Sequence, residues 1–232
     1  VALGRAYRFL CLRLGGLSDE GLRRNSVAKR PVARAVVHAW LAAGGRPRHL
    51  DGAAHLDERF GRQVDVGLRL AELGTGGELH EFLVDESAEV SGAERVLLVL
   101  EDHRGQRHIA SHLLPQSEQG PQAGAEQALL QAITPWLDEA RSTRAASLRI
   151  GPDGAPAVQQ RSCLVAPLIA ERELLGYLYA DLDGAFGRFR EADRDLLVML
   201  AAQAAVALAN LRLREGLEQR VAERTAELLA SK

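Results

Sequence analysis

Residues 161–189, RSCLVAPLIAERELLGYLYADLDGAFGRF, contain two apolar runs that are joined by a short charged turn. The runs, 162–170 and 174–182, are apolar at successive positions and do not alternate with polar residues. That pattern is typical of strands that are covered on both faces of their sheet. We therefore predict two covered strands here. Because Cys163 lies inside the first run, it is either a catalytic thiol or a small buried side chain.

Helical patterns dominate the first third of the chain. Residues 1–43 carry apolar positions at helical spacing, and Pro31 stands where a helix can begin. The cluster of helix breakers at 44–52 then predicts a boundary near residue 50. Two short amphipathic helices are expected within 65–92, parted by glycines.

The middle of the chain combines a hairpin with a further helix. Two strand-like runs flank Arg104 and Gly105, and glycine adopts the positive φ of a tight turn at little cost. Residues 124–144 have a helical pattern that we expect to be interrupted at Pro135.

The composition excludes several functional classes. The chain has 232 residues with 29 Lys and Arg against 31 Asp and Glu, so a formal net charge of -2 provides no basic field for nucleic acid or for an anionic membrane. Its two cysteines are far apart, which favours free thiols in the cytoplasm. The most apolar stretch, 196–209, is shorter than the ~20 residues of a membrane span. Because the chain begins with Val1 and not Met, we expect it to be a piece of a longer protein.

The letters APLIAERELLGYLYADLDGAFGRF, followed by EADRDLLVMLAAQAAVALANLRL, resemble a GAF domain, a small-molecule-sensing relative of the PAS fold. The resemblance covers roughly residues 60–212. It implies an α+β fold in which a central antiparallel sheet has helices on one face and a ligand pocket on the other. We assign 1–50 to a helical N-terminal segment or the end of a preceding domain, 51–212 to the GAF sensor and 213–232 to a coiled-coil linker.

The tail GLEQRVAERTAELLASK is similar to the connectors between such sensors and the histidine kinase or nucleotide cyclase domains of bacterial signalling proteins, including two-component systems. A continuous helix from Glu191 to about Ala230 would be about 60 Å long, so its distal half must project. An apolar stripe on it predicts a parallel homodimer that contacts a downstream kinase or cyclase domain; the stripe is Leu213, Leu217, Val221 and Leu228. The alternative is a solvated helical tail.

The strand GYLYADLD places Tyr177 and Tyr179 on one face. Two buried phenols require polar partners, so this face is the predicted pocket for an unknown small-molecule ligand. Cys163, Val165 and Trp136 are its further candidate members.

Other kinds of site have little support in the sequence. His108 and His112 would stand about 13 Å apart on a strand, too far to share a metal ion. Cys163 precedes Leu164 and not His, which does not support a bilin, and nothing indicates haem. The cyclic-nucleotide motif is half present, because Phe189 and Asp193 match but Arg194 replaces its Glu.

We therefore expect a regulatory GAF sensor and dimerisation module of a multidomain cytosolic signalling protein, without a reaction of its own. Two alternatives remain: a small cysteine- or histidine-dependent enzyme, and a ligand-free dimerisation scaffold.

Overall fold

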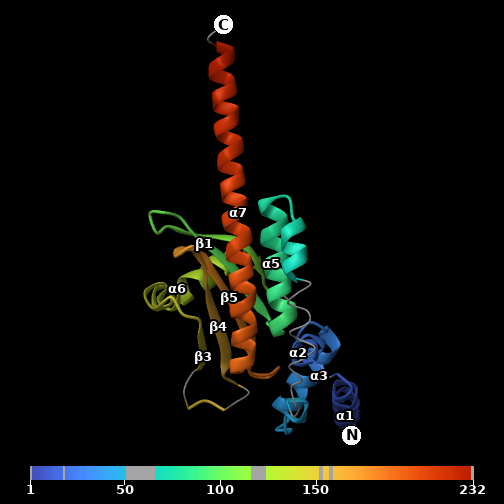
Figure 1. The fold of residues 1–232 in the computed structure, drawn as a ribbon. Helices are drawn as coiled ribbons and strands as arrows, with labels where there is room; N and C mark the ends of the chain where they lie inside the picture. The colour runs from blue at the N-terminus through green and yellow to red at the C-terminus, as the bar shows by residue number, and fades with distance from the viewer. Residues whose placement is uncertain are drawn as a thin grey trace.

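The computed structural model describes residues 2–17, 19–50, 66–115, 124–151, 154–156 and 159–230. In chain order the elements are α1 Ala2–Gly15, α2 Glu20–Ala28, α3 Pro31–Ala42, η1 Arg48–Leu50, a helix at 66–72, α5 Gly76–Ser91, β1 Arg95–Glu101, β2 Arg107–Leu113, α6 Ala125–Thr143, β3 Ser147–Gly151, β4 Arg161–Ala170, β5 Glu173–Asp183 and α7 Glu191–Ala230. The expected α+β class is confirmed (Figure 1).

The five strands form one antiparallel sheet in the order β2-β1-β5-β4-β3. The two runs of the quoted stretch are β4 and β5, which pair along their whole length in the middle of the sheet. The predicted hairpin at Arg104 and Gly105 is β1–β2. Gly176 is required where β5 meets β1, because a Cβ atom there would lie 2.2 Å from the carbonyl oxygen of Val99.

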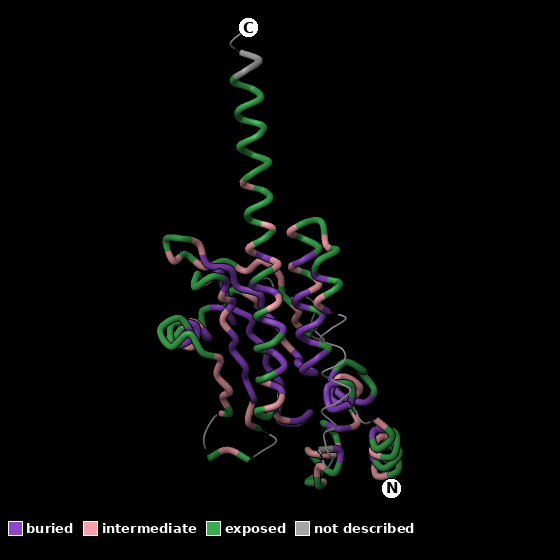
Figure 2. Tube along the Cα trace, viewed as in Figure 1, coloured by how far each residue is buried: buried purple, intermediate pink, exposed green. Residues whose placement is uncertain are grey.

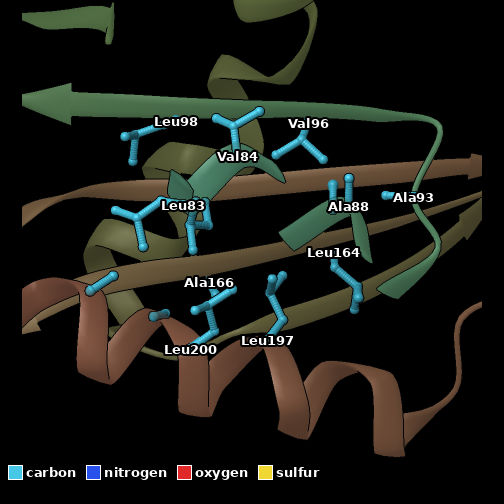
Figure 3. Close-up of a cluster of buried hydrophobic side chains, with 14 of the residues drawn as sticks. Leu83, Val84, Ala88, Ala93, Val96, Leu98, Leu164, Ala166, Leu197 and Leu200 are labelled. Atoms are coloured by element: carbon cyan, nitrogen blue, oxygen red, sulfur yellow. The ribbon is translucent and has the colours of Figure 1, made fainter. Parts of the chain in front are cut away.

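One face of the sheet packs against α5 and α7 (Figure 1). Figure 3 shows Leu83 and Val84 of α5 and Leu197 and Leu200 of α7 directed at the leucines, valines and alanines of β1 and β4. Their side chains are buried, and this is the larger of the two cores. It fixes the N-terminal half of α7 to the sheet.

The opposite face is also covered by a helix, α6, whereas we expected it to be open to a ligand (Figure 1). The helix continues through Pro135, where an interruption was expected. Proline removes one backbone donor, but buried apolar residues on both sides of it, Ile133 and Leu137 among them, anchor the helix to the sheet. Helices on both faces explain why β4 and β5 lack polar alternation.

The N-terminal helices pack beside α5 and the start of α7 (Figure 1). Arg24 of α2 forms a buried ion pair with Asp193 of α7. Arg34 of α3 pairs with Glu94, which precedes β1. His49 is buried and its Nε2 lies 2.6 Å from the carbonyl oxygen of Ala185. Residues 2–50 are thus in direct contact with the sheet domain.

The helix α7 changes character along its 40 residues. Leu197 and Leu200 are buried in the core against the sheet, whereas residues 217–227 are all exposed as the helix projects beyond the domain (Figures 1 and 2). Among the described helices, α7 alone has the length and apolar composition that could cross a bilayer. Within that stretch, Leu197, Leu200 and Leu208 are buried in the larger core.

Candidate functional site

The strands and α6 bring all five predicted pocket residues together. On β5, Tyr177 and Tyr179 face α6, while Leu178 and Ala180 face the other core. On β4, Val165 pairs with Tyr179 in the sheet register and Cys163 lies two residues away on the same face. Trp136 of α6 stacks over Tyr179, with 6.4 Å between ring centroids.

This tyrosine face is filled by protein side chains. Tyr177, Tyr179, Val165 and Cys163 are buried, and Trp136 is partly buried at the edge. The cover comes from a row of α6 side chains: Leu129, Leu130, Ile133, Leu137 and Ala140. The two phenols have the polar partners that we expected, but these partners belong to the protein. That the face binds a ligand stays a prediction.

The hydroxyl of Tyr177 belongs to an ionic cluster at one end of this face. It donates a hydrogen bond of 2.7 Å to Oε2 of Glu101, which is buried at the end of β1. Arg107 binds the same oxygen at 2.9 Å and also pairs with Asp138 of α6. Burial, followed by the Glu101 carboxylate, raises the pKa of Tyr177 to about 12. This cluster ties β1, β2, β5 and α6 together.

A second cluster surrounds Asp181, which is fully buried on β5. Its carboxylate contacts Arg95 at 2.6 Å and Arg161 at 2.6 Å and accepts a hydrogen bond of 2.5 Å from the hydroxyl of Tyr179. Burial and the Asp181 charge raise the pKa of Tyr179 well above its ordinary value. Burial alone would lower the pKa of Arg161, but Asp181 and Glu94 outweigh it, so the pKa is raised and the guanidinium stays charged.

The environment of Cys163 does not suit a nucleophile. Burial is the main cause that raises the pKa of its thiol, and the Tyr179 hydroxyl 3.7 Å from Sγ offsets this in part. A thiol attacks as the thiolate, which a raised pKa disfavours at neutral pH. Cys163 acts here as a small apolar side chain.

The other candidate residues have structural contacts. Phe189 is buried with the guanidinium of Arg24 5.5 Å from its ring centroid. Asp193 accepts a hydrogen bond of 2.7 Å from the backbone N–H of Arg190 at the start of α7. His108 and His112 are both exposed on β2, and within the described ranges no three His, Cys, Asp or Glu side chains are grouped as a metal site would require.

Sequence reasoning missed the ionic residues around the tyrosines, chiefly the buried carboxylates of Glu101 and Asp181 and the partly buried Arg107 and Arg161. A signal was present, because Glu101 and Asp181 end or interrupt apolar strands, and a buried carboxylate requires a cationic partner. The identity of those partners depends on strand register, which the sequence alone does not give.

The architecture defines the class of protein: an α+β domain built on a five-stranded antiparallel sheet with helices on both faces. The GAF domain family model matches residues 78–208, more than half of the chain. The chain therefore belongs to the GAF domain family. Its members are generally sensor or regulatory modules and are typically soluble.

Solved structures show the same fold. The GAF domain of a phosphoenolpyruvate-protein phosphotransferase from Coxiella burnetii is similar with a TM-score of 0.51 and 17% identity, over 70% of this chain and 99% of that one. Free methionine-R-sulfoxide reductase from Neisseria meningitidis, solved with its substrate, gives a TM-score of 0.50 and 17% identity over 72% of this chain and 97% of that one. No curated protein matched the sequence.

Proposed function

We propose that this chain is the sensor and dimerisation module of a multidomain cytosolic signalling protein, and that it transmits a small-molecule or conformational signal along α7. Two α7 helices pair in parallel, and the paired tails lead to a kinase or cyclase domain. Parallel pairing follows from function, because a two-fold symmetric output domain must receive both tails at the same end.

The observation that carries this proposal is the exposed apolar stripe on the projecting helix. Leu213, Leu217 and Val221 are 61%, 55% and 65% exposed, on the stretch of α7 that leads out of the domain (Figure 2). Leu228 lies further along α7, but its side chain falls outside the described residues. A row of leucine and valine side chains does not stabilise a single helix in water, whereas a two-stranded coiled coil buries such a row between its helices.

The same stripe continues onto the folded part of α7. Met199, Val206 and Leu213 are seven residues apart, as are Asn210 and Leu217. Met199 and Val206 are 36% and 56% exposed although their helix packs on the sheet through its opposite side. This heptad spacing supports one dimer contact that runs from the sensor domain into the tail.

The test is the oligomeric state of two matched variants. Leu217→Glu/Val221→Glu should weaken the dimer at least tenfold, as measured by sedimentation equilibrium, because four like charges would enter the helix contact. Gln219→Glu/Ala222→Glu adds the same charge beside the stripe and should leave the dimer intact. A wild-type fragment that is monomeric well above micromolar concentration would refute the proposal.

A ligand-free dimerisation scaffold is the second candidate, favoured by the close packing of α6 over the tyrosine face. A ligand of that face needs α6 to move. Hydrogen exchange separates the two candidates: amides of α6 that open far more readily than those of β4 favour a gated sensor pocket, and amides that open only on global unfolding favour the scaffold.

A further inference from the structure

A groove of about 370 Å³ lies between α1 and α3, at the end of the molecule opposite the projecting half of α7 (Figure 1). Its walls are apolar and are formed mainly by Phe9, Leu10 and Leu14 of α1 and by Val32 and Val36 of α3. Phe9 is 63% exposed and Val32 is 78% exposed. Large apolar side chains gathered in one recess at this exposure indicate a binding surface.

Two cationic side chains, Arg13 and Arg30, line the same groove, together with the hydroxyl-bearing Ser26. Both arginines are exposed, and no ion-pair partner for either is present in the part of the chain that the structure describes. They contrast with Arg24 and Arg34 nearby, whose guanidinium groups are paired with carboxylates.

The charge of the surrounding segment has the same sign. Residues 1–50 contain ten Lys and Arg but two acidic residues, a net charge of +8, whereas the remaining 182 residues contain 19 basic and 29 acidic residues, a net charge of -10. The near-neutral total therefore hides a basic N-terminal segment, although Arg24 and Arg34 of that segment are paired with carboxylates. The positive potential of such a segment attracts anions.

We propose that this groove binds a free single-chain amphiphile with a carboxylate head, that is, a fatty acid. The acyl chain would lie against Phe9, Leu14 and Val32. The guanidinium groups of Arg13 and Arg30 would bind the carboxylate, because a planar guanidinium can donate two parallel hydrogen bonds to the two carboxylate oxygens. The volume lies within the range of about 300–1,000 Å³ that is common for small-ligand pockets. The groove lies outside residues 78–208 of the family match, and the inference does not depend on dimerisation or signal transmission.

The experiment is calorimetric titration of the whole chain with decanoate and dodecanoate below their micellar concentrations. Saturable binding of one molecule per chain is expected, with affinity rising up to about fourfold per added CH₂, the equivalent of about 0.8 kcal/mol. Decyltrimethylammonium has the opposite charge and an alkyl tail one carbon longer than that of decanoate, so its weaker binding, at least tenfold, could not be caused by a shorter tail.

Matched variants separate a built site from general attraction. Arg13→Gln/Arg30→Gln should weaken decanoate at least tenfold, whereas Arg5→Gln/Arg8→Gln removes two exposed charges that do not line the groove and should change the affinity less than twofold. Circular dichroism verifies that each variant is folded. The proposal is overturned if neither acid binds saturably, if the cation binds equally well, if both variants lose affinity alike, or if the chain binds phosphatidylglycerol vesicles but not free acid.

Discussion

Arg24 and Asp193, far apart in the sequence, form an ion pair of 3.0 Å in which both side chains are 1% exposed. Arg24 also donates to the carbonyl oxygens of Ser91 and Arg188, at 3.0 and 2.5 Å. One side chain of α2 thus links the end of α5, the loop before α7 and the first turn of α7. The N-terminal helices are therefore bound to the rest of the domain at the start of α7, the proposed signalling helix.

Breaking this pair should be costly because the Asp193 carboxylate would stay buried without the opposite charge of Arg24. Arg24→Met should lower the free energy of unfolding by about 3–5 kcal/mol, measured by urea denaturation. Arg34→Met is the matched control: the side chain of Arg34 is 34% exposed and its partner Glu94 keeps Arg161, so a loss of about 1 kcal/mol or less is expected. Arg24→Met/Asp193→Asn should recover part of the loss. A change below 1 kcal/mol for Arg24→Met would contradict this account.

The three tyrosines give a prediction for alkaline pH. Burial is the largest cause that raises the pKa of Tyr7 and Tyr177 to about 12, and it raises that of Tyr179 further. Each folded-state pKa is above the unfolded value of about 10, so above pH 10 the native chain binds more protons than the unfolded chain. The stabilisation that these tyrosines contribute is therefore fully present below pH 10 and is lost as the pH rises toward 12.

Phenolate absorbance at 295 nm should accordingly not appear near pH 10 while the far-ultraviolet circular dichroism is native. Tyr177→Phe should make the loss of stability between pH 10 and 12 less steep. A tyrosine that titrates near pH 10 in a chain with an intact circular dichroism spectrum would show that its hydroxyl reaches solvent.

Cys163 should be chemically inert in the folded protein. In a Cys11→Ser background, iodoacetamide should label Cys163 of the folded protein much more slowly than Cys163 of the urea-unfolded protein at neutral pH. The labelling rate should rise at higher pH in the folded than in the unfolded protein, because burial raises the pKa of the thiol above its ordinary value. Cys163→Ala should lower stability by about 1 kcal/mol without changing the oligomeric state. Rapid labelling of native protein at pH 7 would reopen the enzyme alternative.

Local patterns were sufficient for most of the fold. Two-sided apolar runs identified β4 and β5, a glycine turn identified the β1–β2 hairpin, and helical spacing with Pro31 at the first position identified α3. Each of these signals lies within a few neighbouring residues. Local signals survive folding when tertiary packing agrees with them.

What the sequence did not predict is non-local. The cover of the tyrosine face by α6 depends on where a connection returns in space, and the continuation of α6 through Pro135 depends on contacts such as Ile133 and Leu137 with the sheet. The pairing of Asp181 with Arg95 and Arg161 depends on strand register. Residue spacing contains none of this information.

Asn210 gives the sharpest test of how two α7 helices would meet. It is exposed and lies within the apolar stripe, four residues after Val206 and seven before Leu217. A polar Asn at such a core position of a two-stranded coil fixes register and orientation at a cost in stability. We expect Asn210→Leu to tighten the dimer about tenfold, or ~1.4 kcal/mol, and to relax its parallel orientation.

Orientation is measured with Arg224→Cys, seven residues beyond Leu217, in a Cys11→Ser/Cys163→Ala background. A parallel pair brings the two new thiols together and should form a disulfide quickly, whereas an antiparallel pair holds them apart. Adding Asn210→Leu should reduce the disulfide-linked fraction while sedimentation shows a tighter or larger assembly. Gln219→Leu, the same kind of change beside the stripe, should alter neither. If cross-linking and assembly size are both unchanged in the Asn210→Leu chain, Asn210 does not lie in the dimer contact. Replacing an asparagine in the core of a coiled coil should change the orientation of the helices, the size of the assembly, or both.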